Sequence, residues 1–155
     1  MFCQLDQVKQ ILDMASAVKN ILKEERFLNI DLDRKSCSIL YGLLLLKDYD
    51  VFIQRGTVSF EGREFPHHWT EIYLDGEAFI LDINLVSSAK VENRSEDIYF
   101  MPEEDAVKDY GYQALQEYGW KKEDCQREIW QRVLKELNIS KNVDQVLEEI
   151  EEYSL

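Results

Sequence analysis

Three residues, Cys37, His67 and Asp82 in chain order, carry side chains that together could perform acyl transfer. A thiol can act as the nucleophile, an imidazole as its base, and a carboxylate as the group that orients the imidazole. Cys37 opens an apolar run, His67 lies in the segment 65–71, and Asp82 closes the apolar segment 79–82. This order predicts attack of a Cys37 thiolate on a carbonyl, with His67 moving the proton and Asp82 holding His67.

Two helices are expected before the residues that carry the histidine. Apolar residues recur every three or four positions over 6–26, which predicts an amphipathic helix. A second helix, capped by Asp33 or Ser36, is expected to run to about Lys47, and its nearly continuous apolar surface places it in the interior. If it begins between Ser36 and Cys37, the thiol lies in the first turn, where unpaired N–H groups and the helix dipole lower the pKa of a thiol.

Three strands are expected next, at 51–60, 67–74 and 77–83. Branched and aromatic residues dominate these segments, and Asp75-Gly76 between the last two is a strong hairpin signal. We therefore expect an antiparallel sheet in which the last strand returns alongside the second. Its end would then approach the beginning of the second strand.

Alternation along the second strand bears on which histidine is the base. It sends His67, Trp69 and Glu71 to one face of the sheet and His68 to the other. Only one of the two rings can then face the cysteine helix. A shift of the strand by one residue would exchange the faces, so His68 stays open as the alternative to His67.

The C-terminal part, about 102–155, is expected to be helical. The polar segment 86–100 is interpreted as a loop, and a helix is expected to open at Pro102 and to close at Gly119. An amphipathic helix follows over 122–137. A last helix is expected to begin at a capping pair made of two residues three positions apart, Asn142 and Gln145.

Composition limits the class of protein. With 155 residues, 45% of them hydrophobic, the chain 1–155 is expected to form a single domain. A formal charge of -13 disfavours nucleic acid as a partner and leaves a basic protein partner open. The longest apolar run, 39–46, falls far short of a membrane span, and the N-terminus lacks a signal-peptide pattern. We therefore expect a cytoplasmic protein with no membrane contact.

The cysteines do not suggest a disulfide or a metal site. Cys3, Cys37 and Cys125 form neither an even set nor a C-x-x-C pair, which suits a reducing compartment and argues against structural zinc. A metal site built from Cys37, His67 and His68 is not expected, because adjacent strand residues point in opposite directions and no fourth ligand is placed. Cys3 and Cys125 have no comparable neighbours and are interpreted as structural or incidental.

Taken together, the segment 32–85 resembles the transglutaminase-like superfamily of cysteine peptidases and acyltransferases. The usual motif of that family is His-Ala-Trp-x-Glu, so placing Trp69 and Glu71 on it gives the histidine role to His67. Asp82 falls where the family carries its carboxylate. The resemblance implies a papain-like α+β fold, in which the nucleophile-bearing helix packs on an antiparallel sheet, with additional N- and C-terminal helices. It also implies chemistry without a metal or cofactor. We interpret Trp69 and Glu71 first as packing and sheet-edge support and second as residues that shape the cleft, where Trp69 would bind substrate.

The predicted activity is cysteine-dependent acyl transfer on a peptide or protein amide through a thioester. We favour hydrolysis, as by a peptidase or amidase, because no second acceptor site is visible; resolution of the thioester by an amine, as in a transglutaminase, stays open. The segment 34–36, Arg-Lys-Ser, replaces the glycine common in the family just before the cysteine. The alternative is therefore a catalytically inactive module of the same fold that docks a basic partner through the acidic helical surface of residues 103–155.

Overall fold

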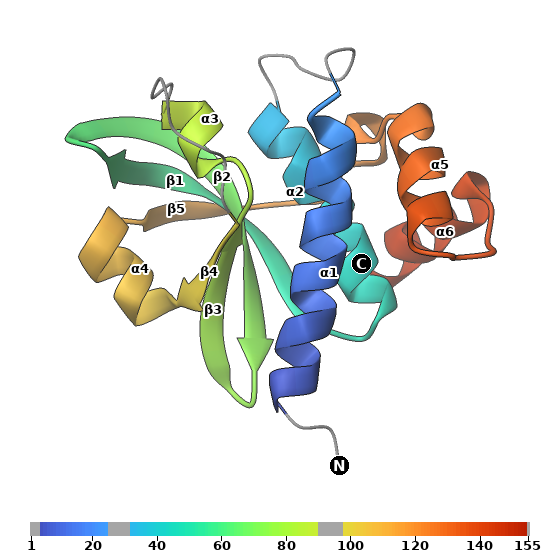
Figure 1. Cartoon of the computed structure of the whole chain (residues 1–155), viewed down its shortest axis with the longest axis horizontal. Coiled ribbons are helices and arrows are strands. Elements are labelled where there is room, and N and C mark those ends of the chain that lie inside the picture. Colours follow the sequence, from blue (N-terminus) through green and yellow to red (C-terminus); the bar gives the residue numbers. More distant parts are fainter. Residues whose placement is uncertain (1–3, 25–31, 90–97, 155) are drawn as a thin grey trace.

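The computed structural model describes residues 4–24, 32–89 and 98–154, which form a mixed α+β structure (Figure 1). Within these ranges the strands form one five-stranded antiparallel sheet in the order β4-β3-β2-β1-β5. The elements are α1 (Gln4–Leu22), α2 (Leu32–Leu46), β1 (Asp50–Phe60), β2 (Arg63–Leu74), β3 (Glu77–Asp82), α3 (Leu85–Ala89), β4 (Tyr99–Pro102), α4 (Glu103–Tyr110), β5 (Gln113–Tyr118), the 3-10 turn η2 (Lys122–Asp124), α5 (Arg127–Glu136) and α6 (Val143–Tyr153).

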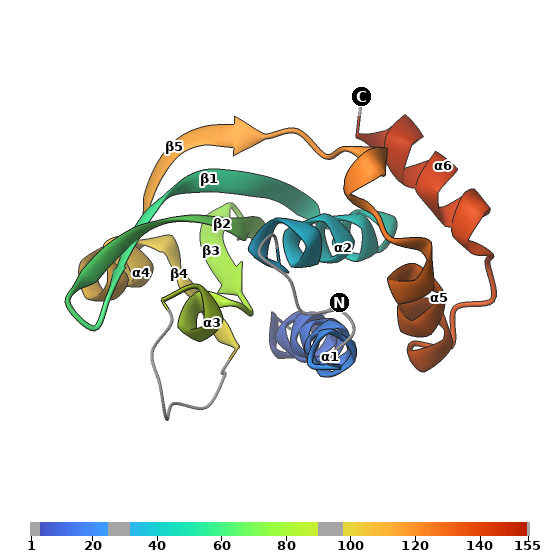
Figure 2. The same ribbon diagram turned by 90° about the horizontal axis from the view of Figure 1, so that it is seen from above.

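Helix α2 is the central helix of the molecule. It contacts β1 and β2 of the sheet, α1 packs along it, and α6 contacts it from the side away from the sheet. Figure 2 shows this arrangement from above, with α2 between the sheet and the pair α5 and α6, and with α3 and α4 near the other end of the sheet. The helix that carries Cys37 is therefore held between the sheet and the other helices.

A tight turn sets the register between β2 and β3. Asp75 and Gly76 join β2 to β3 with φ of 51° and 81°, a left-handed pair that suits the twist of a two-residue hairpin, and the predicted hairpin is confirmed. Thr70 consequently pairs with Leu81, and the Thr70 hydroxyl donates to the Leu81 carbonyl at 2.8 Å. This register carries the end of β3 back toward the beginning of the paired part of β2.

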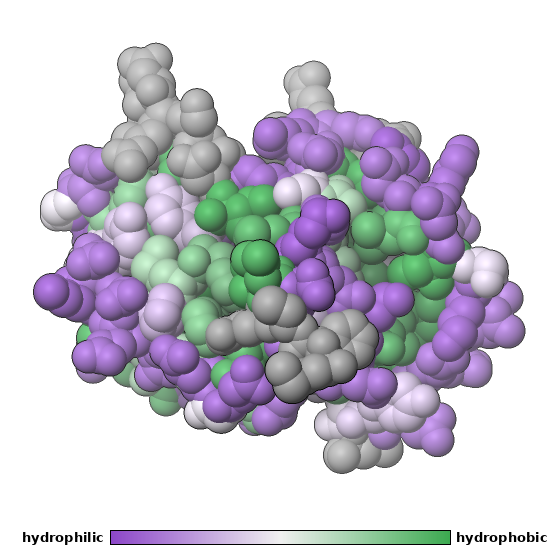
Figure 3. Space-filling view, turned by 60° about the horizontal axis from the view of Figure 1, so that its bottom comes forward, coloured by the Kyte–Doolittle hydropathy of each residue, from purple (hydrophilic) through white to green (hydrophobic). Residues whose placement is uncertain are grey.

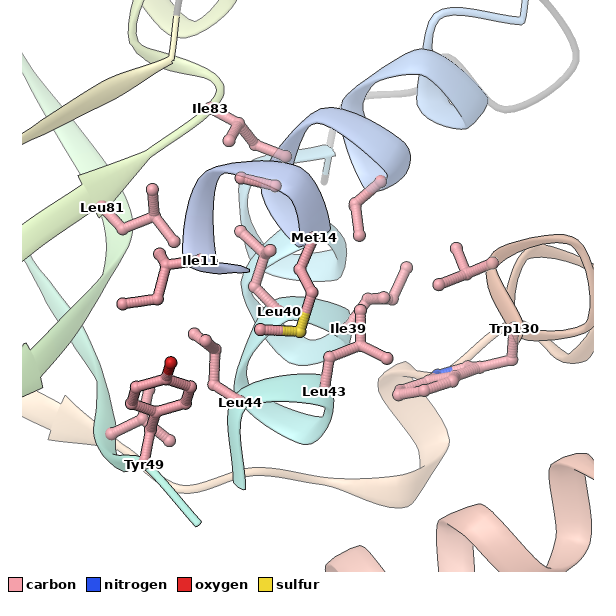
Figure 4. Close-up of a cluster of buried hydrophobic side chains, with 14 of the residues drawn as sticks. Ile11, Met14, Ile39, Leu40, Leu43, Leu44, Tyr49, Leu81, Ile83 and Trp130 are labelled. Carbon is pink, nitrogen blue, oxygen red and sulfur yellow. The ribbon is translucent and has the colours of Figure 1, made fainter. Parts of the chain in front are cut away.

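The two faces of the sheet bury separate apolar clusters. On one face, side chains of α1 and α2 pack toward the strands, and the cluster continues into α5 and α6. Figure 4 shows Ile11, Leu44 and Leu81 in this cluster, with Trp130 at its far side. The other face is covered by α3, α4 and Tyr112, which precedes β5, and it buries aromatic and aliphatic residues. That second cluster consists of Val58, Phe60, Trp69, Ile80, Leu85, Val86, Ala89, Tyr99, Ala106 and Tyr112.

Hydrophobic residues also reach the surface on the side where α1 begins, as Figure 3 shows. A groove of about 320 Å³ on the molecule has an apolar floor that includes Met14, Leu43 and Leu137, with Lys9 and Asp13 among its polar residues.

Among the described residues, no helix is long and apolar enough to cross a membrane.

The C-terminal part is less helical than predicted. Helix α4 ends at Gly111, whose φ of 61° is the left-handed geometry of a helix cap, so the helix stops well before Gly119. The chain then forms β5, which pairs antiparallel with β1. The expected loop at 86–100 is also corrected where it is described, because it contains α3 and the first residues of β4. Residues 90–97 of that prediction lie outside the described ranges.

The other expected helices are found close to their predicted positions. The predicted helix 6–26 corresponds to α1, although residues 25 and 26 lie outside the described ranges. Helix α6 begins at Val143 and is capped by Asn142, whose side chain accepts from the Gln145 N–H while the Gln145 side chain accepts from the Asn142 N–H. The predicted capping pair is confirmed.

Candidate active site

His67 and Asp82 are in direct contact. The His67 Nε2 to Asp82 Oδ2 distance is 2.7 Å, and both side chains are buried. The contact follows from the register, because Asp82 extends the pairing of β3 to a position opposite Trp69, two residues after His67 on the same face of the sheet. The sequence prediction that these two residues meet is therefore supported by the geometry.

Asp82 is held by two further donors, which fix its carboxylate. The Tyr112 hydroxyl donates to Asp82 Oδ2 at 2.7 Å, and the Asn84 backbone N–H donates to Oδ1 at 2.9 Å. Burial and the charge of Asp82 raise the pKa of Tyr112 well above its ordinary value, so Tyr112 stays a donor at every physiological pH. Asn84 also donates from its side chain to the Ser36 hydroxyl of α2. These bonds tie the carboxylate to the cysteine helix.

The other ring nitrogen of His67 faces α2. Its Nδ1 lies 3.6 Å from Asp33 Oδ2, and the same oxygen lies 3.0 Å from His68 Nδ1 and accepts from the His68 backbone N–H at 3.1 Å. Burial alone would raise the pKa of Asp33, but the hydrogen bond from His68 and the charges of both histidines outweigh it and lower that pKa. Asp33 is therefore an ionised anchor for both rings.

Cys37 stands on the same side of α2 as Asp33. The two residues are four positions apart, which places their side chains one above the other along the helix. Burial raises the pKa of the Cys37 thiol well above its ordinary value, and the charges of Asp82 and Asp33 raise it further. Both carboxylates are thus close enough to act on the sulfur, and Cys37 shares an electrostatic environment with the His67–Asp82 pair.

Two expectations about Cys37 are corrected. Helix α2 begins at Leu32, so Cys37 lies in its second turn instead of its first, and its N–H belongs to the regular helical hydrogen-bonding pattern. The thiol therefore lacks the stabilisation of free N–H groups, and its pKa is raised where the sequence analysis expected a lowered one. Ser36 does not cap the helix, because its hydroxyl donates to the Asp33 carbonyl within it.

The three groups are closed off from solvent. The exposed fractions are 4% for Cys37, 1% for His67 and 3% for Asp82. A substrate carbonyl cannot reach the sulfur in this arrangement without movement of the side chains that cover it. The structure therefore describes a closed form in which Cys37 is a neutral thiol.

Trp69 lies behind the imidazole of His67. It is 1% exposed, its ring stacks against His67 with centroids 6.4 Å apart, and it meets Tyr112 edge-on at 5.0 Å. This environment agrees with the prediction that Trp69 is first a packing residue, and its substrate-binding role stays a prediction. Glu71, the other residue of the motif, accepts hydrogen bonds from Gln54 and Tyr73.

His68 is less favourably placed than His67 to serve as the base. Its ring contacts Asp33 and meets Tyr118 edge-on at 5.1 Å. It therefore stands on the β5 side of Asp33, whereas His67 is the ring that Asp82 holds. The expectation that only one histidine faces α2 is wrong in one respect, because the Asp33 carboxylate of that helix reaches both rings.

The remaining cysteines give no second candidate nucleophile within the described residues. Cys125 is partly buried, and burial raises the pKa of its thiol to about 11. Cys3 lies outside the described ranges. Across 4–24, 32–89 and 98–154, no group of three or more His, Cys, Asp or Glu side chains could hold a metal ion.

Sequence reasoning missed Asp33 as an anchor, together with Tyr112 and Asn84. Asp33 was considered only as a helix cap, and Tyr112 was assigned to a helix. The contact of the Asn84 backbone carried a usable signal in Asp82, because an Asp side chain often accepts from the N–H two residues later.

Comparison with protein-family models, curated proteins and solved structures gives no match for this chain. The resemblance to the transglutaminase-like superfamily therefore stays a prediction.

Proposed function

We propose that this protein is a cysteine-dependent acyl transferase or hydrolase acting on a peptide or protein amide, with a transglutaminase-like, papain-related core. The observation that carries the proposal is the buried His67–Asp82 pair, 2.7 Å apart, with the second ring nitrogen turned toward the helix that bears Cys37. Asp82 would fix the tautomer and orientation of the ring, as a carboxylate does in a nucleophile–base–acid triad.

The proposed reaction begins from a neutral thiol. As the Cys37 sulfur attacks the amide carbonyl, its proton passes to His67, and a carbon–sulfur bond forms while the carbonyl oxygen gains the negative charge. Collapse of this intermediate breaks the carbon–nitrogen bond, and His67 returns the proton to the departing amine. A water molecule then cleaves the thioester, releasing a carboxylic acid and restoring the thiol.

The raised pKa of Cys37 shapes this proposal. A thiol that is neutral at rest requires His67 to act as a general base during attack, in place of a preformed thiolate–imidazolium pair. Productive binding must also uncover the sulfur, which is 4% exposed. We therefore propose that the closed form is a resting form and that a substrate opens it.

The test is a hydrolysis assay with a peptide mixture in water enriched in ¹⁸O. The wild-type protein is expected to produce new carboxyl termini that carry ¹⁸O, and Cys37→Ala is expected to produce none. Cys125→Ala is the matched control, because its thiol lies away from the His67–Asp82 pair, and it should keep full activity. New amide links to added amines, without ¹⁸O uptake, would point to transamidation. Equal products from Cys37→Ala would exclude the proposed nucleophile.

A second candidate function is a catalytically inactive module of the same fold that docks a basic partner through its acidic helical surface. Two observations favour it, namely the burial of Cys37 and its raised pKa, since neither is needed for catalysis. Acidic residues also line the first turn of α4 and the exposed side of α6. This candidate predicts that iodoacetamide near pH 8 leaves Cys37 unmodified in the folded protein even when peptides are present.

A further inference from the structure

A second feature lies one helical turn beyond Cys37 along α2. Tyr41 follows Cys37 by four residues, as Cys37 follows Asp33, so the three side chains form a row along one side of the helix. Tyr41 lines a cavity of about 550 Å³ between α2, β1, β5 and α6. In Figure 2 the chain after β5 runs from the sheet toward α6, above the helix that carries Tyr41.

The floor of this cavity is aromatic. Tyr41, Phe52, Tyr118 and Trp120 line it, and each is partly buried. Aromatic faces attract cations through their quadrupole, and the protein itself already shows this, because Lys121 Nζ lies 5.1 Å from the centroid of the Tyr118 ring. The floor therefore has the chemistry of a cation-binding surface.

The rim of the cavity is charged. Glu117, Glu123 and Glu151 contribute carboxylates, against the ammonium groups of Lys121 and Lys122. The whole chain carries a formal charge of -13, so its field favours cationic ligands over anionic ones. Burial and the nearby charge of Glu117 raise the pKa of Tyr41, which indicates that this carboxylate acts on the floor of the cavity.

Trp120 is one of the residues that line the cavity, and its ring can report on a ligand bound there. Its Nε1 is buried and has no hydrogen-bond acceptor among the described residues. The indole N–H signal of Trp120 is therefore expected to be sensitive to a change in the surroundings of the ring.

The cavity is connected to the candidate active site by direct contacts. Tyr118 meets His68 edge-on at 5.1 Å, and His68 contacts Asp33, whose carboxylate lies 3.6 Å from His67 Nδ1. We propose that this cavity is a specificity pocket that takes the arginine or lysine side chain of a peptide substrate whose amide is presented to Cys37. The inference rests on the proposed function, since it treats the bound cation as part of the substrate.

Binding can be tested without turnover. The probes are Nα-acetyl-arginine amide, the lysine analogue, and Nα-acetyl-citrulline amide, which has nearly the shape of the arginine probe but no charge. The readout is the indole N–H signal of Trp120 in a ¹⁵N NMR spectrum, assigned with Trp120→Phe. The arginine probe is expected to shift this signal and to bind about three- to tenfold more tightly than the citrulline probe.

Paired variants decide whether the carboxylates of the rim are responsible. The double variant Glu117→Gln/Glu151→Gln is expected to bind both probes equally, whereas the control Glu104→Gln/Glu136→Gln, with the same change of net charge away from the cavity, should keep the preference. Equal binding of arginine and citrulline by the wild type would overturn the inference. So would an undiminished preference in the Glu117→Gln/Glu151→Gln variant.

The outcomes separate this inference from the proposed function. Turnover of peptides without any preference for arginine or lysine over citrulline would overturn the pocket and leave the acyl-transfer proposal in place. Charge-selective binding by a protein that hydrolyses no peptide would support the cation site and count against the acyl-transfer proposal. Cys37→Ala should bind the probes as the wild type does.

Discussion

Replacing Tyr112 by Phe tests the network that holds the candidate active site together. The change removes one oxygen and leaves the ring, which is 3% exposed and packs edge-on against Trp69. The lost group is the hydroxyl that donates to Asp82 Oδ2 at 2.7 Å. Asp82 then keeps His67 and the Asn84 N–H as partners at a site that is 3% exposed.

The expected effect can be estimated from the type of bond. A hydrogen bond to a charged group contributes about 1.5–3 kcal/mol to stability, and a buried group that loses it is not resolvated. For a chain of this length each kcal/mol corresponds to about 2–4 °C in the midpoint of thermal unfolding, so we expect a decrease of about 3–12 °C. Any activity should also fall, because Asp82 orients His67 less firmly.

The assay is urea unfolding of Tyr112→Phe, Asp82→Asn and the double variant, analysed as a double-mutant cycle. The control is Tyr110→Phe, which removes a hydroxyl from the same aromatic cluster. Within the described residues, the Tyr110 hydroxyl makes no hydrogen bond. The control should therefore change the free energy of unfolding by less than about 0.5 kcal/mol. If Tyr112→Phe costs as much in the Asp82→Asn background as in the wild type, the hydroxyl does not act through the carboxylate and the reasoning fails.

Two further predictions concern α2. Gly42→Ala would place a Cβ 2.5 Å from Ile150 Cδ1 and 2.8 Å from Trp130 Cη2, so it should destabilise the protein by about 1–3 kcal/mol in thermal unfolding. Asp33→Asn should cost about 1–2 kcal/mol near neutral pH, because it removes the ionised partner of the histidine rings. The pKa of Asp33 is lowered by folding from its ordinary value of 3.8, so its stabilising effect is present above that pH, and the cost of Asp33→Asn should disappear as the pH falls below it.

Matched variants control these two predictions. Gly119→Ala makes the same change where a Cβ would meet nothing within 4 Å, and it should leave the midpoint of unfolding almost unchanged. An equal loss in both glycine variants would show that packing against α5 and α6 is not the cause. For Asp33, a stability difference that stays constant from neutral to strongly acidic pH would show that the charge of the carboxylate is not involved.

Local signals in the sequence predicted the parts of the fold that local chemistry determines. Asp75-Gly76 requires left-handed backbone and forms the hairpin that brings Asp82 toward His67. Asn142 and Gln145 satisfy each other's backbone N–H groups at the start of α6. In both cases neighbouring residues decide the structure, so no distant contact is needed to predict it.

The features that the sequence did not predict depend on pairing between strands that are far apart in the chain. Residues Gln113–Glu117 of β5 are exposed and include good helix formers, but their backbone pairs with β1 at the edge of the sheet. Tyr112 precedes this strand and reaches Asp82 only because of that pairing. Tertiary hydrogen bonds outweigh helix propensity here, and a single sequence gives no sign of them.

The environment of Cys37 depends on burial in the same way. From residue type and position we predicted that the Cys37 thiol lies near a histidine and a carboxylate. The direction of its pKa shift, however, depends on how completely the helix is buried and on how near Asp33 lies. A pattern of residues can predict which groups meet. It cannot predict how much water remains beside them.

The most direct test of the account is the rate at which p-nitrophenyl acetate acylates Cys37, resolved from Cys3 and Cys125 by peptide mass analysis. The account predicts that the folded wild-type protein acquires one acetyl group on Cys37 and that His67→Gln slows this step by about a hundredfold or more. A rate of Cys37 acylation that is the same in His67→Gln as in the wild type would contradict the account.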